Sequence, residues 1–105
     1  MEINDDARRL FEEMNLSRDA AEVIAKGLAQ RIIDTAEDPP LQGIVYDVWG
    51  LYNEGIPRCR FSIEDASGHV TFEGRFKATN ARSVSRSLTC TPDEMLAVLD
   101  EVKSI

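Results

Sequence analysis

The stretch that most constrains the fold is RCRFSIEDASGHVTFEGRFK, residues 58–77, because its apolar and polar side chains alternate. Alternation of this kind is typical of strands with one buried face. The apolar positions are odd-numbered before the turn signal at 65–68 and even-numbered after it, so only a register with Phe61 opposite Phe72 keeps both sets on one face. The sequence therefore predicts an antiparallel hairpin whose inward residues are Cys59, Phe61, Ile63, Val70, Phe72, Gly74 and Phe76.

The same register predicts which polar residues meet on the outer face of the hairpin. It pairs Glu64 with His69, Ser62 with Thr71 and Arg60 with Glu73, and it places Arg58 opposite Arg75. Like charges directly opposed on a sheet are destabilising. We therefore expect this end of the face to accept an anionic group, either from the protein's own acidic helices, from a second copy or from a partner. The expected anion-binding residues are Arg58, Arg60, Arg75 and Lys77.

Apolar residues at intervals of three and four predict two helices before residue 37. Asn4 or Asp5 is the expected N-cap of the first helix and Ser17 that of the second, which should run to about Ala36, where two prolines follow. Gly27 disfavours the second helix by about 1 kcal/mol, and we expect another backbone to come close to it. The two apolar stripes are Ile3, Ala7, Leu10, Phe11 and Met14, then Ala21, Ile24, Ala25, Leu28 and Ile32.

The remaining segments complete an α+β pattern. Residues 44–52 are β-branched and aromatic, which favours a strand with both sides apolar, and residues 83–90 are a weaker strand candidate. Thr91 and Glu94 form a capping box with proline at the first helical position of a third helix. Consecutive strands between terminal helices predict a single α+β domain over residues 1–105, in the order ααββββα. The sheet should be antiparallel, with three to four strands and the helices mainly on one face.

The formal net charge of −7 is unevenly distributed along the chain. Residues 1–55 hold twelve acidic and five basic side chains, whereas residues 56–90 hold three acidic and six basic ones. An acidic protein is a poor match to nucleic acid, and the hairpin aromatics lie on the inward line, where they cannot stack on bases. We therefore expect no direct nucleic-acid binding and instead a basic protein partner, including one that itself binds nucleic acid.

Two groups of residues are the candidates for binding such a partner. Acidic side chains on the first two helices can face a basic surface, although a solvated face is the commoner role of such residues. Tryptophan and tyrosine are enriched at protein interfaces, so the strand at 44–52 can contribute to a partner interface or a homodimer. The alternative is that the helices cover this strand as core. The predicted partner-binding residues are Glu12, Glu13, Asp19, Glu22, Trp49 and Tyr52.

The sequence holds no catalytic or cofactor signature. His69 is the only histidine, so a Ser/His or Cys/His pair must use it, and no third orienting group can be assigned to it. Cys59 and Cys90 lack the spacing of a zinc site. Cys59 should pack inward, while Cys90, just before the last helix, can be the more reactive thiol. We expect no enzymatic activity, no metal and no cofactor.

No segment approaches the roughly 18 consecutive apolar residues of a membrane span, and two cysteines are too few for a disulfide framework. The expected setting is cytoplasmic, without a membrane. The sequence thus predicts a small acidic, non-catalytic protein-binding module, such as an inhibitor, immunity-type factor, adaptor or chaperone that acts on a basic partner. The alternative is a regulatory domain that binds an anion or small molecule on its basic sheet face. An enzyme that uses His69 or Cys90 is a third interpretation.

Overall fold

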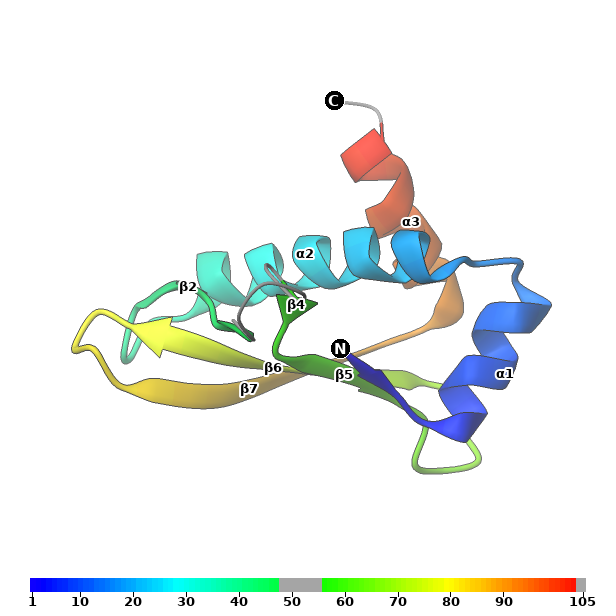
Figure 1. Ribbon diagram of the computed structural model, residues 1–105, viewed down its shortest axis with the longest axis horizontal. Coiled ribbons are helices and arrows are strands. Elements are labelled where there is room, and N and C mark those ends of the chain that lie inside the picture. The colour runs from blue at the N-terminus through cyan, green and yellow to red at the C-terminus, as the bar shows by residue number, and fades with distance from the viewer. Residues whose placement is uncertain (48–55, 104–105) are drawn as a thin grey trace.

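The structure is a computed structural model that describes residues 1–47 and 56–103, and its fold belongs to the α+β class (Figure 1). Two helices lie in the N-terminal part of the chain and one in the C-terminal part, as the sequence predicts. The helices are α1 (Asp5–Glu13), α2 (Arg18–Thr35) and α3 (Pro92–Lys103). A five-stranded sheet contains β1 (Glu2–Ile3), β2 (Leu41–Ile44), β5 (Cys59–Ser62), β6 (Val70–Ala78) and β7 (Ser83–Cys90), and β3 (Tyr46–Asp47) pairs separately with β4 (Ile56–Pro57).

The sheet is mixed, which corrects the prediction of a purely antiparallel sheet with three to four strands. Strand β1 pairs parallel with β5, with Glu2 beside Arg60 and Ile3 beside Phe61. The backbone N–H of Asn4 then donates to the Phe61 carbonyl at 3.0 Å, immediately before α1 begins. Ile3, expected on the first helical stripe, therefore lies in a strand and still packs partly buried against the core.

The predicted hairpin register is confirmed over the ladder of β5 and β6. Phe61 pairs with Phe72, Arg60 with Glu73, and Ser62 with Thr71. Both phenylalanines are fully buried, and their ring centroids lie 5.3 Å apart. Helix α1 is joined to this pair by Phe11, whose ring packs edge-on against Phe61 at 5.2 Å.

Strand β6 is the centre of the sheet. One edge of β6 pairs with β7. The other edge pairs with β5 before Arg75 and with β2 after it. The candidate strand at 83–90 is thus confirmed as β7. The prediction of one continuous strand over residues 44–52 is wrong for the described residues. Ile44 ends β2, and Tyr46 begins β3 in the second sheet. Residues 48–52 of that prediction lie outside the described residues.

Local signals set the helix ends as expected. The Asn4 side chain accepts from the Ala7 N–H at 3.0 Å, and the Ser17 hydroxyl accepts from the Ala20 N–H at 3.1 Å. The capping box before α3 is formed, since the Glu94 N–H donates to the Thr91 hydroxyl at 3.2 Å and the Thr91 N–H donates to the Glu94 carboxylate at 3.3 Å.

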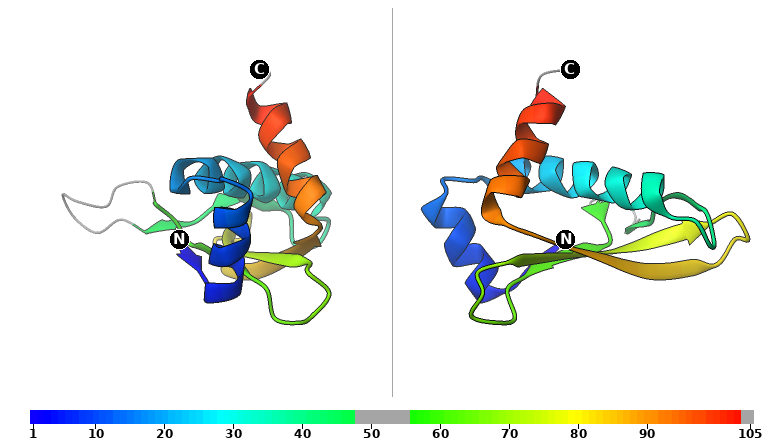
Figure 2. Two further views of the ribbon diagram at one scale, coloured as in Figure 1. Left: turned by 90° about the vertical axis from the view of Figure 1, so that its right-hand side faces the viewer. Right: turned by 180° about the vertical axis from the view of Figure 1, so that it is seen from behind.

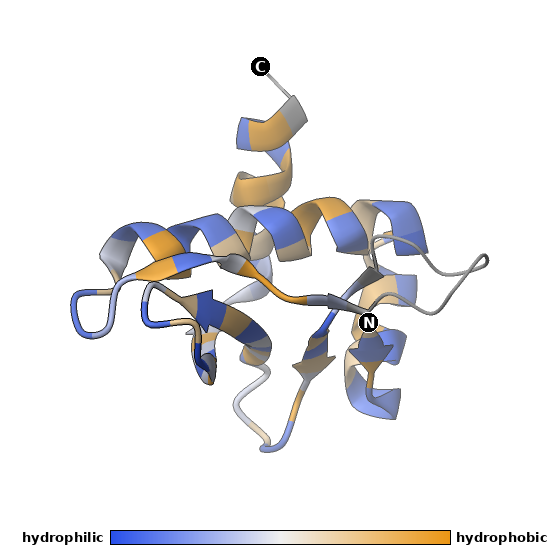
Figure 3. Cartoon of the chain, turned by 60° about the vertical axis from the view of Figure 1, so that its left-hand side comes forward, coloured by the Kyte–Doolittle hydropathy of each residue, from blue (hydrophilic) through white to orange (hydrophobic). Residues whose placement is uncertain are grey.

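Helix α2 lies over one face of the sheet, α3 packs against α2 on the same side and rises away from the sheet, and α1 packs against one end of it (Figures 1 and 2). Hydrophilic and hydrophobic residues are interleaved along the helices (Figure 3). The inward stripe predicted for α2, from Ala21 to Ile32, is buried. The neighbour that comes close to Gly27 is the Val98 side chain of α3 rather than the expected backbone, and a β-carbon at Gly27 would overlap it. No described helix is long and apolar enough to cross a membrane.

Candidate functional site: an arginine pair on the open sheet face

The sheet face opposite the helices is polar and is covered by no described helix (Figure 1). Alternation along each strand sends the phenylalanines to the helix side and the charged residues to this outer face. On β6 the exposed residues Glu73, Arg75 and Lys77 alternate with the buried Phe72, Gly74, Phe76 and Ala78. On β7 the outer residues are hydroxylic and exposed, namely Ser83, Ser85, Ser87 and Thr89.

Arg58 and Arg75 are held side by side by a backbone junction. The Arg75 N–H donates to the Arg58 carbonyl at 2.9 Å, and the Arg58 N–H donates to the Val45 carbonyl at 2.9 Å. The Val45 N–H closes the junction by donating to the Arg75 carbonyl at 2.7 Å. Three strand segments therefore meet at one point, and the predicted opposition of two cations is fixed by main-chain bonds rather than by the flexible side chains.

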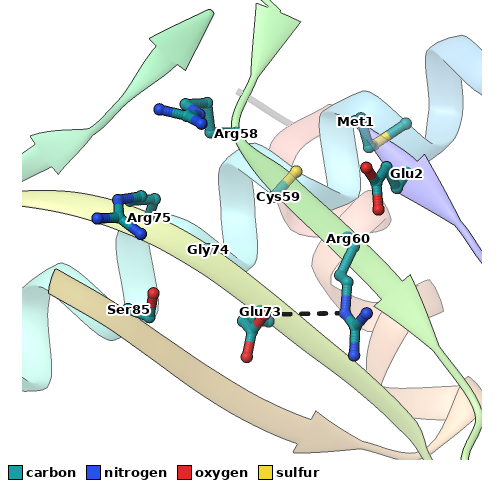
Figure 4. A pocket seen from close by; sticks show the side chains of 9 residues that line it. All are labelled: Met1, Glu2, Arg58, Cys59, Arg60, Glu73, Gly74, Arg75 and Ser85. Atoms are coloured by element: carbon teal, nitrogen blue, oxygen red, sulfur yellow. Dashed lines mark ion pairs between the residues drawn. The ribbon is translucent and has the colours of Figure 1, made fainter. Parts of the chain in front are cut away.

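This junction borders a shallow depression of about 240 Å³. Arg75 lies between Arg58 and Ser85, and Arg60 on β5 and Glu73 on β6 lie beside them (Figure 4). The first residues of the chain, Met1 and Glu2, and the strand residues Cys59 and Gly74 complete the lining. The depression is thus built from β1, β5, β6 and β7, with cationic, hydroxyl and carboxylate groups around it.

The cations in and near the depression differ in whether a carboxylate lies beside them. Arg60, predicted to bind an anion, lies 3.7 Å from Glu73 and 3.7 Å from Glu64, so its charge is largely balanced. No carboxylate of the described chain forms an ion pair with Arg75 or Lys77. Lys77 lies two residues further along β6 and does not line the depression. Arg75 is therefore the described cation best placed to receive an anion there.

The predicted contact between Glu64 and His69 is wrong. The β5–β6 ladder ends at Ser62 and Thr71, so the next expected pair does not form. Glu64 turns to Arg60 instead, and the His69 ring lies 2.9 Å from the Ser67 hydroxyl.

Asp65, Ser67 and His69 form an exposed turn rather than a catalytic triad. The Ser67 hydroxyl and the Ser67 N–H both donate to Asp65 Oδ1, and these bonds lower the pKa of the Asp65 carboxyl. In a triad the histidine takes the serine proton and the carboxylate orients the histidine. Here the serine lies between the other two groups and its proton is directed to the carboxylate. The arrangement stabilises the turn and offers no activated nucleophile.

The expectation of a reactive Cys90 is wrong, because the residue is only 2% exposed and burial raises the pKa of its thiol to about 11. Cys59 packs inward as predicted, and burial likewise raises its pKa to about 11. Both thiols are therefore protonated and shielded at neutral pH. The described residues contain no group of three or more His, Cys, Asp or Glu side chains placed to hold a metal ion.

The predicted partner-binding acids lie on α1 and at the start of α2. Glu12, Glu13 and Asp19 are exposed and Glu22 is half-buried, and none of the four forms an ion pair with another described residue. Their helices also carry cations, since Arg8 and Arg9 pair with Asp5 and Asp6 one turn away. Trp49 and Tyr52 lie outside the described residues.

Sequence reasoning missed three parts of the site: the Val45 junction, the wall formed by Met1 and Glu2, and Ser85 beside Arg75. Only the last had a usable signal, because pairing residues 83–90 with β6 would have placed serines next to the basic residues. Comparison of the chain with protein-family models, with curated proteins and with solved structures returns no match.

Proposed function

We propose that this chain is a non-catalytic binding module that receives an anionic group of its partner or ligand at the depression beside Arg58 and Arg75. The observation that carries the proposal is the backbone junction that keeps these two guanidinium-bearing residues together on an open face. Arginine offers a planar set of donors that matches carboxylate and phosphate groups. Ser85 adds a hydroxyl next to Arg75, so charge and hydrogen-bond donors converge at one place.

The anion is expected to be one that is presented from outside rather than enclosed. The depression is shallow and open, whereas drug-sized ligands usually occupy clefts of roughly 300–1,000 Å³. A carboxylate or phosphate group at the end of a larger molecule fits this shape better than a small molecule that must be buried completely.

Titration of 15N-labelled protein with inorganic phosphate and with citrate tests the proposal. We expect saturable chemical-shift changes at the Arg58, Arg75 and Ser85 amides, weakened by salt because the contacts are electrostatic. Arg75→Gln should abolish these changes. Arg82→Gln, which removes one exposed arginine outside the depression, is the matched control and should retain them. Equal binding by both variants, or no saturable binding by the unmodified protein, would overturn the proposal.

A second candidate, a partner with a basic surface, is favoured by the four helical acids that have no described ion-pair partner. We infer that Glu12, Glu13, Asp19 and Glu22 would contribute mainly to the association rate, because charge complementarity steers encounters. A quadruple variant with these residues changed to their amides should lose binding to a basic protein. Control substitutions at Asp34, Glu37, Asp38 and Asp93 change the net charge equally and should not. Equal losses would show that only net charge matters.

A further inference from the structure

The outer edge of β7 is long and regular. Strand β7 spans 8 residues and pairs with β6 without a shift from Val70–Cys90 to Lys77–Ser83. Besides β6, no described strand pairs with it, and it runs along the border of the sheet in the view from behind (Figure 2, right). Proteins usually protect such edges with proline, bulges, short strands or several charges. Of these devices β7 has only one charge, Arg86.

The pairing pattern determines which backbone groups of β7 are available. The N–H and carbonyl of Arg75 face away from β7, toward Arg58 and Val45. Backbone groups alternate in direction along a strand, so Gly74 and Phe76 face β7 and bond to their partners Arg86 and Val84. The N–H and carbonyl groups of Ser83, Ser85 and Ser87 must then point to the open edge.

One contact supports this assignment and shows how the edge is occupied. The Arg86 side chain donates from Nη1 to the Ser85 carbonyl at 2.9 Å. That carbonyl lies outside the β6–β7 ladder and accepts a side-chain donor instead. An incoming strand would replace this single bond with main-chain bonds along the edge, and an acidic side chain beside Arg86 would draw its guanidinium away from Ser85.

The outer face gives the edge a charge preference. Lys77 pairs with Ser83, Arg75 with Ser85, and Glu73 with Ser87. Serine is short, and an added strand would lie two strand spacings from β6, about 9–10 Å. An extended arginine or lysine can meet a glutamate across that distance. Acidic residues are therefore favoured beside Ser83 and Ser85, and a basic one beside Ser87.

The helix-side face adds a second preference. Val84 and Leu88 are half-buried and flank Arg86. The incoming strand should therefore carry apolar residues beside Val84 and Leu88 and an acidic residue beside Arg86. A second copy of this chain fits poorly, because residues 82–90 carry two arginines and no acid. Pairing two β7 strands would bring like charges together.

We propose that β7 binds an extended, acidic segment of a partner protein by antiparallel strand addition. Main-chain hydrogen bonds to Ser83, Ser85 and Ser87 supply affinity, and the cations of β6 and Arg86 supply selectivity. The inference deepens the proposed function, since Arg75 serves both the depression and the edge, but the main-chain bonds to β7 do not depend on the depression.

The probe is a capped peptide, Val-Lys-Glu-Glu-Val-Glu, whose residues would lie in order beside Leu88, Ser87, Arg86, Ser85, Val84 and Ser83. Titrated into 15N-labelled protein, it should shift the amides of Ser83, Ser85 and Ser87 and slow their hydrogen exchange. The same peptide with lysine in place of every glutamate should bind at least about tenfold more weakly, because each opposed cation pair becomes repulsive. Equal binding by the two peptides would overturn the charge assignment.

Ser87→Pro and Ser87→Ala form a matched pair of protein variants. Proline removes an N–H that faces the edge and leaves the β6–β7 bonds intact, so peptide binding should weaken by about tenfold or more. Alanine keeps the N–H and should bind like the unmodified protein. Ser87 does not line the depression, so inorganic phosphate should still bind to Ser87→Pro. If the unmodified protein did not bind phosphate but bound the peptide, only the proposed function would be contradicted.

A peptide-side pair keeps the test valid even if Ser87→Pro fails to fold. Methylating the peptide nitrogen beside Ser85 should abolish binding, because that N–H would face β7. Methylating the nitrogen beside Arg86, which would face away from β7, should be tolerated. Equal effects of the two methyl groups, or concentration-dependent self-association of the protein through β7, would overturn the proposal.

Discussion

The side-chain amide of Asn4 binds both backbone groups of Ile63: its Oδ1 accepts from the Ile63 N–H at 3.2 Å, and its Nδ2 donates to the Ile63 carbonyl at 3.2 Å. The same Oδ1 accepts from the Ala7 N–H at the start of α1. One residue thus caps α1 and extends the contacts of the parallel strand β1 along β5 as far as Ile63. This link also positions Met1 and Glu2 at the wall of the depression.

Replacing Asn4 should therefore lower the free energy of unfolding by more than the removal of an ordinary N-cap does. We expect Asn4→Ala to lower the free energy of unfolding by about 2–3 kcal/mol, from one cap and two further hydrogen bonds. Asn4→Asp keeps the acceptor but loses the donor to Ile63, and should be intermediate. Urea unfolding measures both. A loss below about 0.5 kcal/mol for Asn4→Ala would show that water replaces the amide without penalty.

Gly27 should be required by the packing of α2 against α3. Alanine favours a helix by about 1 kcal/mol over glycine, but its β-carbon would overlap Val98. We expect Gly27→Ala to destabilise the protein by about 1–3 kcal/mol. In a Val98→Ala background the same substitution should be neutral or stabilising. Thermal unfolding of the four proteins gives the coupling between the two sites, and additive effects would contradict the packing argument.

Arg75 should carry a small electrostatic penalty, because it has no ion-pair partner among the described residues and lies next to another cation. We expect Arg75→Gln to raise the free energy of unfolding by a few tenths of a kcal/mol at low ionic strength, and the gain to vanish in high salt. Arg82→Gln is the control for a change in net charge. A stability loss in Arg75→Gln at all salt concentrations would indicate that Arg75 is structural.

The two buried thiols should make the protein less stable in alkali. Desolvation raises the pKa of Cys59 and of Cys90 from 9.0 to about 11. A raised pKa in the folded state contributes stability that is complete below pH 9 and is lost as the pH rises toward 11. We expect a loss of about 2 kcal/mol for each thiol over that range.

A Cys59→Ala/Cys90→Ala variant isolates this effect from other groups that titrate in alkali. Its stability should fall less steeply between pH 9 and 11 than that of the unmodified protein, as measured by urea unfolding at each pH. Parallel curves would contradict the assignment. At neutral pH, alkylation of both thiols should be slow until the protein is unfolded.

The sequence by itself determined the elements that depend on local periodicity and local hydrogen bonding. Asn4, Ser17 and Thr91 cap helices because each cap involves residues only three positions apart. The β5–β6 register followed from the parity of the apolar positions, and with it the opposition of Arg58 and Arg75. A one-residue slip would have exposed the phenylalanines, so only one register was compatible with a buried face.

Only the tertiary structure decided the parts that depend on non-local pairing. The two-residue strand β1 has too few residues for a periodic signal, and the division of residues 44–47 between two sheets depends on where Val45 meets Arg75. Cys90 lies next to a helix start, but its pKa is governed by burial rather than by that position. The open edge of β7 likewise depends on which strands lie beside it in space. The sequence predicted the arginine pair, whereas the depression around it and the edge beside it arise from long-range packing.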